Sequence, residues 1–187
     1  MLQKRCEFKM GIYFITGNRN KLEEVKSIFP EVESLSLDLP EIQELNAERI
    51  IEEKLKEASK FHSGELFCED TSLYINCLNG LPGPLIKWFL QSLGNQGIYD
   101  LVKSHSDLRA TAKTVIGYAG KGKIRFFSGE VQGSIVEPRG KTQFGWDPLF
   151  QPNGHIKTFA EMSREEKNEI SMRREALEKL KEYLEKD

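Results

Sequence analysis

The apolar positions along the chain predict an α/β protein, because short uninterrupted apolar runs alternate with stripes at helical spacing. The first run, Ile12 to Ile15, has no polar alternation, which is typical of a strand buried on both faces of a sheet. Helical stripes follow in residues 22–29 and 46–61, the second with Asn46 as a suitable N-cap. Residues 32–37 alternate and predict a second strand between these helices.

The later part of the chain predicts shorter elements around one long ribbon. Residues 109–119 and 123–137 are expected to form two antiparallel strands joined at Gly120–Gly122. Paired ribbons of this length commonly lie partly outside a central sheet, so we expect a second lobe and a cleft between the lobes. A last helix is predicted over 163–186, opened by a Ser-x-x-Glu capping box. Short strands are expected at 66–68 and 73–75, and short helical segments at 85–93 and 97–102.

The chain length of 187 residues suits one substantial core, and no repeat, low-complexity tract or linker divides the sequence. We expect residues 1–10 to form a loose N-terminal tail and residues 11–187 to form a single domain. Residues 1–10 lack the apolar core of a signal peptide, and no apolar run approaches the length of a transmembrane helix. These features predict a protein with no membrane partner.

The net charge, the cysteines and the histidines restrict the classes of ligand and partner that the protein could bind. The net charge of −2 gives no indication of a nucleic-acid surface, so a polyanionic ligand would have to be held in a pocket. The three cysteines form no C-x-x-C pair, which favours a reduced cytoplasmic compartment. The three histidines are scattered, so neither a zinc cluster nor an H-E-x-x-H helix is available. Binding of a hard metal through carboxylates remains open.

The turn after the first strand is the first candidate site. Gly17 permits a tight turn, Thr16 and Asn18 offer side-chain hydrogen bonds, and Lys21 adds a positive charge on the first turn of the following helix. Together they favour an anion, most plausibly a phosphate. The sequence has neither a P-loop nor a G-x-G-x-x-G fingerprint here. The alternative interpretation is an ordinary strand-to-helix connection capped by Asn18 or Asn20.

Carboxylates and lysines supply the candidate chemistry. Glu41 in a loop and Glu69 and Asp70 at the expected end of a strand suit Mg²⁺, which binds through one or two carboxylates together with substrate phosphates. A nearby acid can also activate a water molecule. A site that combines such acids with cations resembles the sites that cleave phosphoanhydrides, in which water is the nucleophile. The candidate cations are Lys21, Lys54, Lys87 and Lys167. The alternative is that the acids are a solvated loop residue and a turn, and that the lysines are surface residues.

Two further segments carry candidate binding residues. The loop Phe144-Gly145-Trp146-Asp147 offers an aromatic platform for a base and a carboxylate for its edge, although its aromatic residues are equally typical of a core. Lys167 and Arg173 are six positions apart, about 240° around a continuous helix. They share a pocket only if the helix breaks between them or the ligand wraps its end.

Several blocks of the sequence resemble one known family. These blocks are ITGNRNKLEEV, LDLPEIQ, FCEDTSLYINCLNGLPGPLIKWF, IVEPRGKTQFGWDPLFQPNG and FAEMSREEKNEIS. In order from about Ile12 to Tyr183 they are similar to the inosine triphosphate pyrophosphatase family, which hydrolyses deaminated purine nucleoside triphosphates. The resemblance implies an elongated, twisted mixed sheet flanked by helices, with two lobes, a central cleft and assembly as a homodimer.

The resemblance also implies the reaction and the residues. ITP, dITP and XTP would be hydrolysed to the monophosphate and pyrophosphate, which prevents their incorporation into nucleic acids, and Mg²⁺ would be required, with Mn²⁺ able to replace it. The implied catalytic residues are Asp70, Lys21 and Glu41, and the implied metal ligands are Glu41, Asp70 and Glu69. Which of the acids is the general base stays open. The implied substrate site comprises Thr16, Gly17, Asn18, Lys21, Lys54, Glu69, Asp70, Thr71, Lys87, Phe144, Gly145, Trp146, Asp147, Lys167, Ser171, Met172 and Arg173.

One position departs from the family pattern. The family typically has Ser-His-Arg where this chain has Ser171-Met172-Arg173. Methionine can pack against a base but cannot donate a hydrogen bond. We therefore expect weaker discrimination between oxo and amino purines than in relatives with the histidine. Two alternatives remain: a nucleotide pyrophosphatase with a different base preference, and a protein that binds nucleotides without hydrolysing them.

Overall fold

The computed structural model describes residues 11–141 and 145–186. The expected tail over residues 1–10 lies outside the described residues. Within them, no helix is both long enough and apolar enough to cross a membrane.

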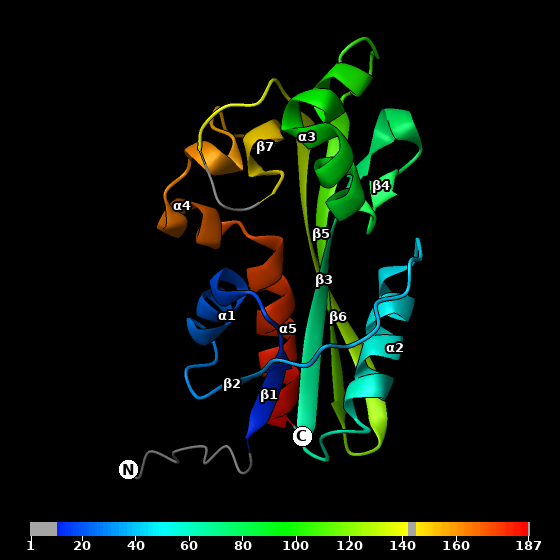
Figure 1. Cartoon of the computed structure of the whole chain (residues 1–187). Helices are drawn as coiled ribbons and strands as arrows, with labels where there is room; N and C mark the ends of the chain where they lie inside the picture. The colour runs from blue at the N-terminus through cyan, green and yellow to red at the C-terminus, as the bar shows by residue number, and fades with distance from the viewer. Residues whose placement is uncertain (1–10, 142–144, 187) are drawn as a thin grey trace, which may run out of the picture.

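A twisted mixed sheet runs along the long axis of the molecule (Figure 1). In the described residues it contains seven strands in the order β2-β1-β3-β5-β6-β7, with the short strand β4 paired to β3. Strands β2, β1 and β3 are parallel, and the remaining pairs are antiparallel. The strands are β1 (Ile12–Ile15), β2 (Glu33–Leu35), β3 (Glu65–Ile75), β4 (Pro82–Gly83), β5 (Arg109–Gly120), β6 (Lys123–Ile135) and β7 (Phe150–Pro152). The prediction of a mixed sheet flanked by helices is confirmed.

Helices cover both faces of this sheet. The α-helices are α1 (Arg19–Lys26), α2 (Ala47–Ala58), α3 (Ile86–Val102), α4 (Arg164–Glu169) and α5 (Met172–Lys186), and the short 3-10 helices are η1 (Asn76–Leu78), η2 (Asp147–Leu149) and η3 (Phe159–Glu161). At one end of the sheet, α1 and α5 lie on one side of β3 and α2 lies on the other, while α3, α4 and β7 gather at the opposite end (Figure 1).

Three hydrophobic clusters divide the molecule into two lobes. The lobe at the bottom of Figure 1, which contains β1, α2 and α5, is called the lower lobe, and the lobe with α3 and β7 is called the upper lobe. In the lower lobe, one cluster joins Phe14 and Phe67 of the sheet to α1 and α5, and a second joins Cys68 to α2 on the opposite face. In the upper lobe, a single cluster gathers around Trp146 and Phe150 with α3 and η3. Strands β3, β5 and β6 pass from one lobe to the other, so the lobes share a continuous sheet (Figure 1).

Side-chain caps begin the helices at the predicted positions. The Asn18 side chain accepts hydrogen bonds from the amides of Asn20 and Lys21 at 3.0 and 3.2 Å, and Asn46 caps α2 through the amide of Glu48. Ser163 and Glu166 form the capping box of α4. Each cap satisfies amides at the start of a helix that have no partner within the helix.

The structure corrects two element predictions and bears out a third. The two short strands expected at 66–68 and 73–75 are one strand, because residues from Leu66 to Ile75 pair without interruption with β5 and hold the intervening polar residues in the ladder. The two helical segments expected at 85–93 and 97–102 are both present within α3, which is interrupted at Gly94, whose φ of 65° and ψ of 178° are not helical. The helix expected over 163–186 breaks after Glu169, and α5 begins at Met172.

Candidate active site

The candidate site lies at the carboxyl edge of the parallel strands. Strand β1 pairs with β3 as far as Phe14 opposite Phe67 and ends at Ile15, whereas β3 continues to Ile75. The turn at Thr16–Asn18 therefore leaves the sheet beside Glu69 and Asp70, which are the first residues of β3 beyond the end of β1. Ligands of open α/β sheets bind outside this edge.

The turn at Thr16–Asn18 caps helix α1 and at the same time leaves the Gly17 backbone open to solvent. The Thr16 hydroxyl accepts a hydrogen bond from the Asn18 amide at 3.1 Å, and Asn18 caps α1 as described. Capping by Asn18, the alternative interpretation of the sequence, is thus confirmed. A Cβ on Gly17 would meet only the Ser36 hydroxyl, at 4.0 Å, so the backbone here is open to a ligand. Both functions are compatible, because a capped helix start still presents its positive end to an anion.

Glu69 and Asp70 point to opposite faces of β3, because successive side chains of a strand alternate. Glu69 faces α1 and α5, where its carboxylate lies 3.1 Å from the Lys21 amine and 2.8 Å from the Arg173 guanidinium. Asp70 faces the side of α2 and accepts a hydrogen bond from the Ser72 hydroxyl at 2.8 Å. The prediction that the acids end a strand is wrong, but the register still brings them to the edge of the parallel strands.

A buried ion network forms around Arg173. Its guanidinium donates to both oxygens of Glu69, pairs with Glu24 of α1, and lies 3.4 Å from the Thr71 hydroxyl. Both Arg173 and Glu69 are buried. Burial alone would raise the pKa of Glu69, but the charges of Arg173 and Lys21 outweigh it and hold the pKa at about 2. The same carboxylates keep the pKa of Arg173 above its usual value despite burial.

A close contact of α5 with the sheet places Arg173 in this network. A Cβ on Gly129 of β6 would lie 2.1 Å from the Met172 carbonyl oxygen, so only glycine permits the start of α5 to approach this closely. Ser171 precedes the helix and its hydroxyl accepts from the Arg173 amide at 3.2 Å.

The network predicts an acid transition that depends on Glu69. Because the folded-state pKa of about 2 lies below the ordinary value of 4.5, ionised Glu69 stabilises the protein fully above pH 4.5, and this contribution is lost as the pH falls toward 2. We expect Glu69→Gln to unfold in urea at a midpoint that changes less with pH over this range than the midpoint of the wild type. An unchanged pH dependence in Glu69→Gln would contradict the assignment.

Glu41 and Asp70 remain the candidate metal ligands. Lys54 of α2 lies 3.4 Å from the Glu41 carboxylate. Burial raises the pKa of Asp70; Ser72, Lys21 and Lys54 oppose this shift, and Glu41 adds to it. Glu41, Lys54 and Asp70 thus form one electrostatic group on the α2 side of the sheet.

The donor set of this group fits Mg²⁺. In residues 11–141 and 145–186 no three or more His, Cys, Asp or Glu side chains gather as a complete metal site. Two carboxylates are nevertheless sufficient for Mg²⁺, which keeps waters and takes its other ligands from substrate phosphates. Glu69 does not fit the role of ligand, because both of its oxygens are occupied by the cations of Lys21 and Arg173.

Lys87 belongs to the other lobe and is linked to the Glu41 loop through its neighbour Trp88. It lies on the first turn of α3, with its amine 5.2 Å from the centre of the Trp88 ring. The Trp88 indole N–H donates to the side-chain oxygen of Gln43, in the loop that carries Glu41. No motif in the sequence indicates a role for Gln43 or Trp88, and nothing in their local pattern pairs them.

A pocket of about 250 Å³ lies between α1 and α4, on the Glu69 side of the sheet. Its walls include Asp147 and Lys167, whose carboxylate and amine are 2.5 Å apart. Glu24 also lines it and links it to Arg173. The helix breaks between α4 and α5, and Lys167 lines this pocket whereas Arg173 does not; the pocket and Arg173 are connected through Glu24. Glu24 was missed, although it shares a helical face with Lys21 three residues earlier.

Among the remaining predicted binding residues that the structure describes, one is exposed and two are buried in the hydrophobic core. Gly145 is exposed and accepts a hydrogen bond from the Asn95 side chain at 2.9 Å. Trp146 and Met172 are buried in the upper-lobe cluster, so the core interpretation holds for Trp146. Met172 therefore does not present its side chain to solvent. Phe144 lies outside the described residues.

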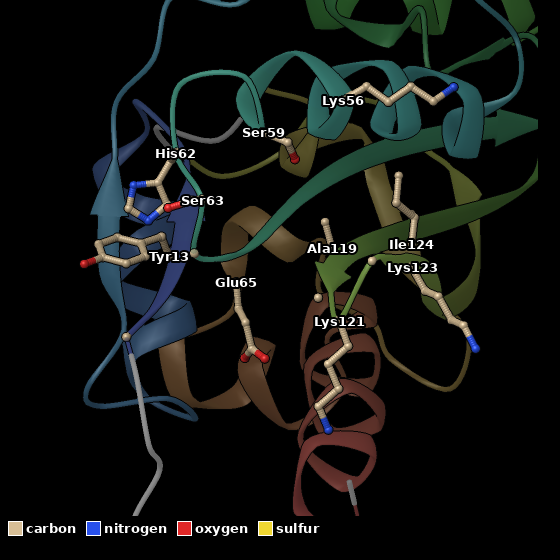
Figure 2. A pocket seen from close by; sticks show the side chains of 14 residues that line it. Tyr13, Lys56, Ser59, His62, Ser63, Glu65, Ala119, Lys121, Lys123 and Ile124 are labelled. Atoms are coloured by element: carbon tan, nitrogen blue, oxygen red, sulfur yellow. The ribbon is translucent and has the colours of Figure 1, made fainter.

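A larger cavity, of about 810 Å³, lies at the opposite end of the sheet, between the loop before β3 and the β5–β6 turn (Figure 2). None of the predicted site residues lines it. Its lysines Lys56, Lys121 and Lys123 point in different directions in Figure 2, and Lys56 pairs with Glu52 and Glu53. This cavity lacks the convergent polar groups that a ligand site requires.

The fold and the edge of the sheet together define a class of protein. A mixed sheet with a capped turn, acids on the α2 side and an ion network on the α5 side defines an α/β protein with polar groups at the carboxyl ends of its parallel strands, where open α/β sheets bind ligands.

The chain belongs to the Ham1 family, whose model matches residues 12–183. It is 44% identical over 182 residues to the inosine triphosphate pyrophosphatase of Schizosaccharomyces pombe, covering 95% of this chain and 96% of the relative. It is 41% identical to the inosine triphosphate pyrophosphatase of Puccinia graminis f. sp. tritici, covering 94% and 97%. Among solved structures, a HAM1 protein from Coxiella burnetii superposes with a TM-score of 0.82 at 27% identity, covering 95% of this chain and 100% of that one.

Proposed function

We propose that this protein hydrolyses deaminated purine nucleoside triphosphates, namely ITP, dITP and XTP, to the monophosphate and pyrophosphate. The observation that carries the proposal is the placement of Asp70, buried on the α2 side of β3 with Glu41 and Lys54, directly beyond the end of β1. Membership of the Ham1 family and the names of the two fungal relatives support the same activity.

The α2 side of the edge holds the triphosphate in this proposal. The turn at Thr16–Asn18 binds phosphate oxygens, and Lys21, Lys54 and Lys87 neutralise their charge. Glu41 and Asp70 would hold Mg²⁺, or Mn²⁺ in its place, and the bound ion would further neutralise the phosphate oxygens. The Asp70 carboxylate accepts the proton of the attacking water. Water attacks the α-phosphorus and forms the new P–O bond of the monophosphate as its proton passes to Asp70; the anhydride bond between the α- and β-phosphates breaks, and pyrophosphate leaves.

The α5 side holds the nucleobase. Asp147 and Lys167 face the 250 Å³ pocket, and Glu24 connects this pocket to Arg173. Arginine donates and never accepts, so Arg173 favours a purine with an oxo group at position 6 over one with an amine. The substrate thus crosses the end of β1, with its base beside α1 and α4 and its phosphates beside α2.

The resemblance, rather than the buried position of Met172, predicts a limited preference for ITP over ATP. Because methionine donates no hydrogen bond, one discriminating contact is missing, and such a contact contributes about 0.5–1.5 kcal/mol, or about 2- to 12-fold in selectivity. We expect Met172→His to raise the ratio of kcat/KM for ITP to kcat/KM for ATP by this factor. Competition assays on both proteins measure the ratio, with thermal unfolding as the control for folding. An equal ratio in a folded variant would contradict the prediction.

The resemblance further supports a single catalytic domain over residues 11–187, a homodimer and a cytoplasmic location, with no nucleic-acid polymer as partner. Equilibrium sedimentation tests the homodimer.

A panel of nucleoside triphosphates tests the proposed activity. With Mg²⁺ present, we expect kcat/KM for ITP, dITP and XTP to exceed that for ATP and the pyrimidine nucleotides. The highest value for a pyrimidine nucleotide would assign a different base preference. Tight binding of ITP without product would instead identify a nucleotide-binding protein that lacks turnover.

A further inference from the structure

The loop that carries Glu41 has few anchors of its own. Residues 36–46 form neither helix nor strand, and no backbone–backbone hydrogen bond joins residues 36–45 to any other described residue. Leu37 and Leu39 pack against the lower-lobe cluster, but Glu41 and the residues that follow it are largely exposed. Within the lower lobe, the polar contacts of this part are with α2, through Lys54 and Arg49. The Arg49–Glu44 pair is exposed and the Lys54–Glu41 pair is partly exposed, and ion pairs open to solvent hold a loop weakly.

A chain of side-chain hydrogen bonds ties this loop to the other lobe. The Trp88 indole N–H donates to the side-chain oxygen of Gln43, and the Gln43 amide nitrogen donates to the backbone carbonyl of Glu41 at 3.1 Å. Only one orientation of the Gln43 amide satisfies both bonds, because the indole can only donate and the carbonyl can only accept. The position of the Glu41 backbone therefore depends on Trp88.

The same indole also contacts Lys87. The Lys87 amine lies 5.2 Å from the centre of the Trp88 ring, within the range of a cation–π interaction. Trp88 belongs to α3, whose neighbour Ile86 packs in the upper-lobe cluster, whereas the Glu41 loop packs in the lower lobe. One ring thus connects a candidate metal ligand of one lobe to a candidate phosphate ligand of the other, and Figure 1 shows the chain before α2 rising toward β4 and α3.

We propose that Trp88 and Gln43 are positioning residues that hold Glu41 against Lys87 across the two lobes, and so set the affinity of the site for the complex of Mg²⁺ with the triphosphate. The inference rests on the proposed function of the site. Because Trp88 is 46% exposed, its hydrogen bond competes with water and contributes to positioning more than to the stability of the fold.

Variants at both ends of the chain of hydrogen bonds test the proposal. Trp88→Phe keeps an aromatic ring beside Lys87 but removes the N–H donor, and Gln43→Met removes both amide bonds. With an ITP analogue whose α–β bridge is not hydrolysable, we expect the Mg²⁺ concentration for half-maximal binding, measured by calorimetry, to rise about 3- to 10-fold in each variant. Because the two residues act as one unit, the double variant should lose no more than the larger single loss.

Two controls separate positioning from folding. Gln91→Met changes an exposed glutamine of α3 in the same way and should leave the Mg²⁺ dependence unchanged. In the protein without ligand, Gln43→Met should increase quenching of tryptophan fluorescence by acrylamide, because Trp88 is the exposed one of the two tryptophans and Trp146 is buried.

The outcomes are distinct. Additive losses in the double variant, or an unchanged Mg²⁺ dependence in Trp88→Phe, would overturn the proposal, even if either variant melts at a lower temperature. Wild-type protein that binds the analogue with Mg²⁺ but hydrolyses no ITP would remove the proposed function and leave the positioning result readable. Wild-type protein that fails to bind the analogue would overturn both.

Discussion

Asp70→Asn is expected to reduce the rate of pyrophosphate release from ITP by about 10²- to 10⁴-fold, the contribution typical of a positioned general base. The substitution removes the proton acceptor but keeps the size of the side chain and an oxygen for the Ser72 hydroxyl. Steady-state rates at saturating Mg²⁺ and ITP measure the loss.

Asp70→Asn should lose activity but keep or gain stability. Burial raises the folded-state pKa of Asp70 above its ordinary value, so the ionised carboxylate lowers the free energy of unfolding at neutral pH. Asparagine removes this cost, and Tm should stay equal or rise. Asp100→Asn on the exposed face of α3 is the matched control and should keep full activity. Loss of activity together with a lower Tm would mean that Asp70 supports the fold instead.

The second large effect is on stability. Arg173→Met keeps the apolar length of the side chain but leaves the buried carboxylate of Glu69 with Lys21 as its remaining cation. Breaking a buried ion pair from one side costs about 3–5 kcal/mol, so we expect a decrease of this size in the free energy of unfolding. Urea unfolding at pH 7 measures it.

The neighbouring residue provides the control for that measurement. Arg174 pairs with Glu178 on the surface of α5, one turn away, with both side chains about half exposed. Surface pairs contribute about 0–1 kcal/mol, so Arg174→Met should change stability little. Equal losses in Arg173→Met and Arg174→Met would show that the buried network does not stabilise the protein. Restoration of stability when Glu69→Gln is added to Arg173→Met would confirm that the unpaired carboxylate is the cause.

Local sequence signals predicted much of the fold. Asn18, Asn46 and Ser163 cap their helices as expected, because a cap is decided by a few adjacent residues. The long ribbon of β5 and β6 was equally visible, since its turn and its alternation are local. Boundaries failed where a distant partner decides the structure, as in β3, whose polar middle stays in the sheet only because β5 pairs with it throughout.

Dependence on distant partners also explains where the site residues lie. The sequence placed Glu69 beside Asp70 as a metal ligand, but a continuous strand sends neighbouring side chains to opposite faces. Glu69 then meets Arg173, which arrives from α5 far along the chain. The contact of Trp88 with Gln43 likewise joins an exposed loop to a distant helix and leaves no periodic pattern. Residue types thus indicated the chemistry, and tertiary register decided which residues share it.

The product of ITP hydrolysis tests the account most directly. Phosphorus NMR of ITP incubated with the protein and Mg²⁺ distinguishes pyrophosphate from orthophosphate in one spectrum. We predict IMP and pyrophosphate in equal amounts, no orthophosphate, and neither product from Asp70→Asn on the same timescale. Orthophosphate with IDP, or full pyrophosphate release by Asp70→Asn, would contradict a site in which Asp70 activates water at the end of β1.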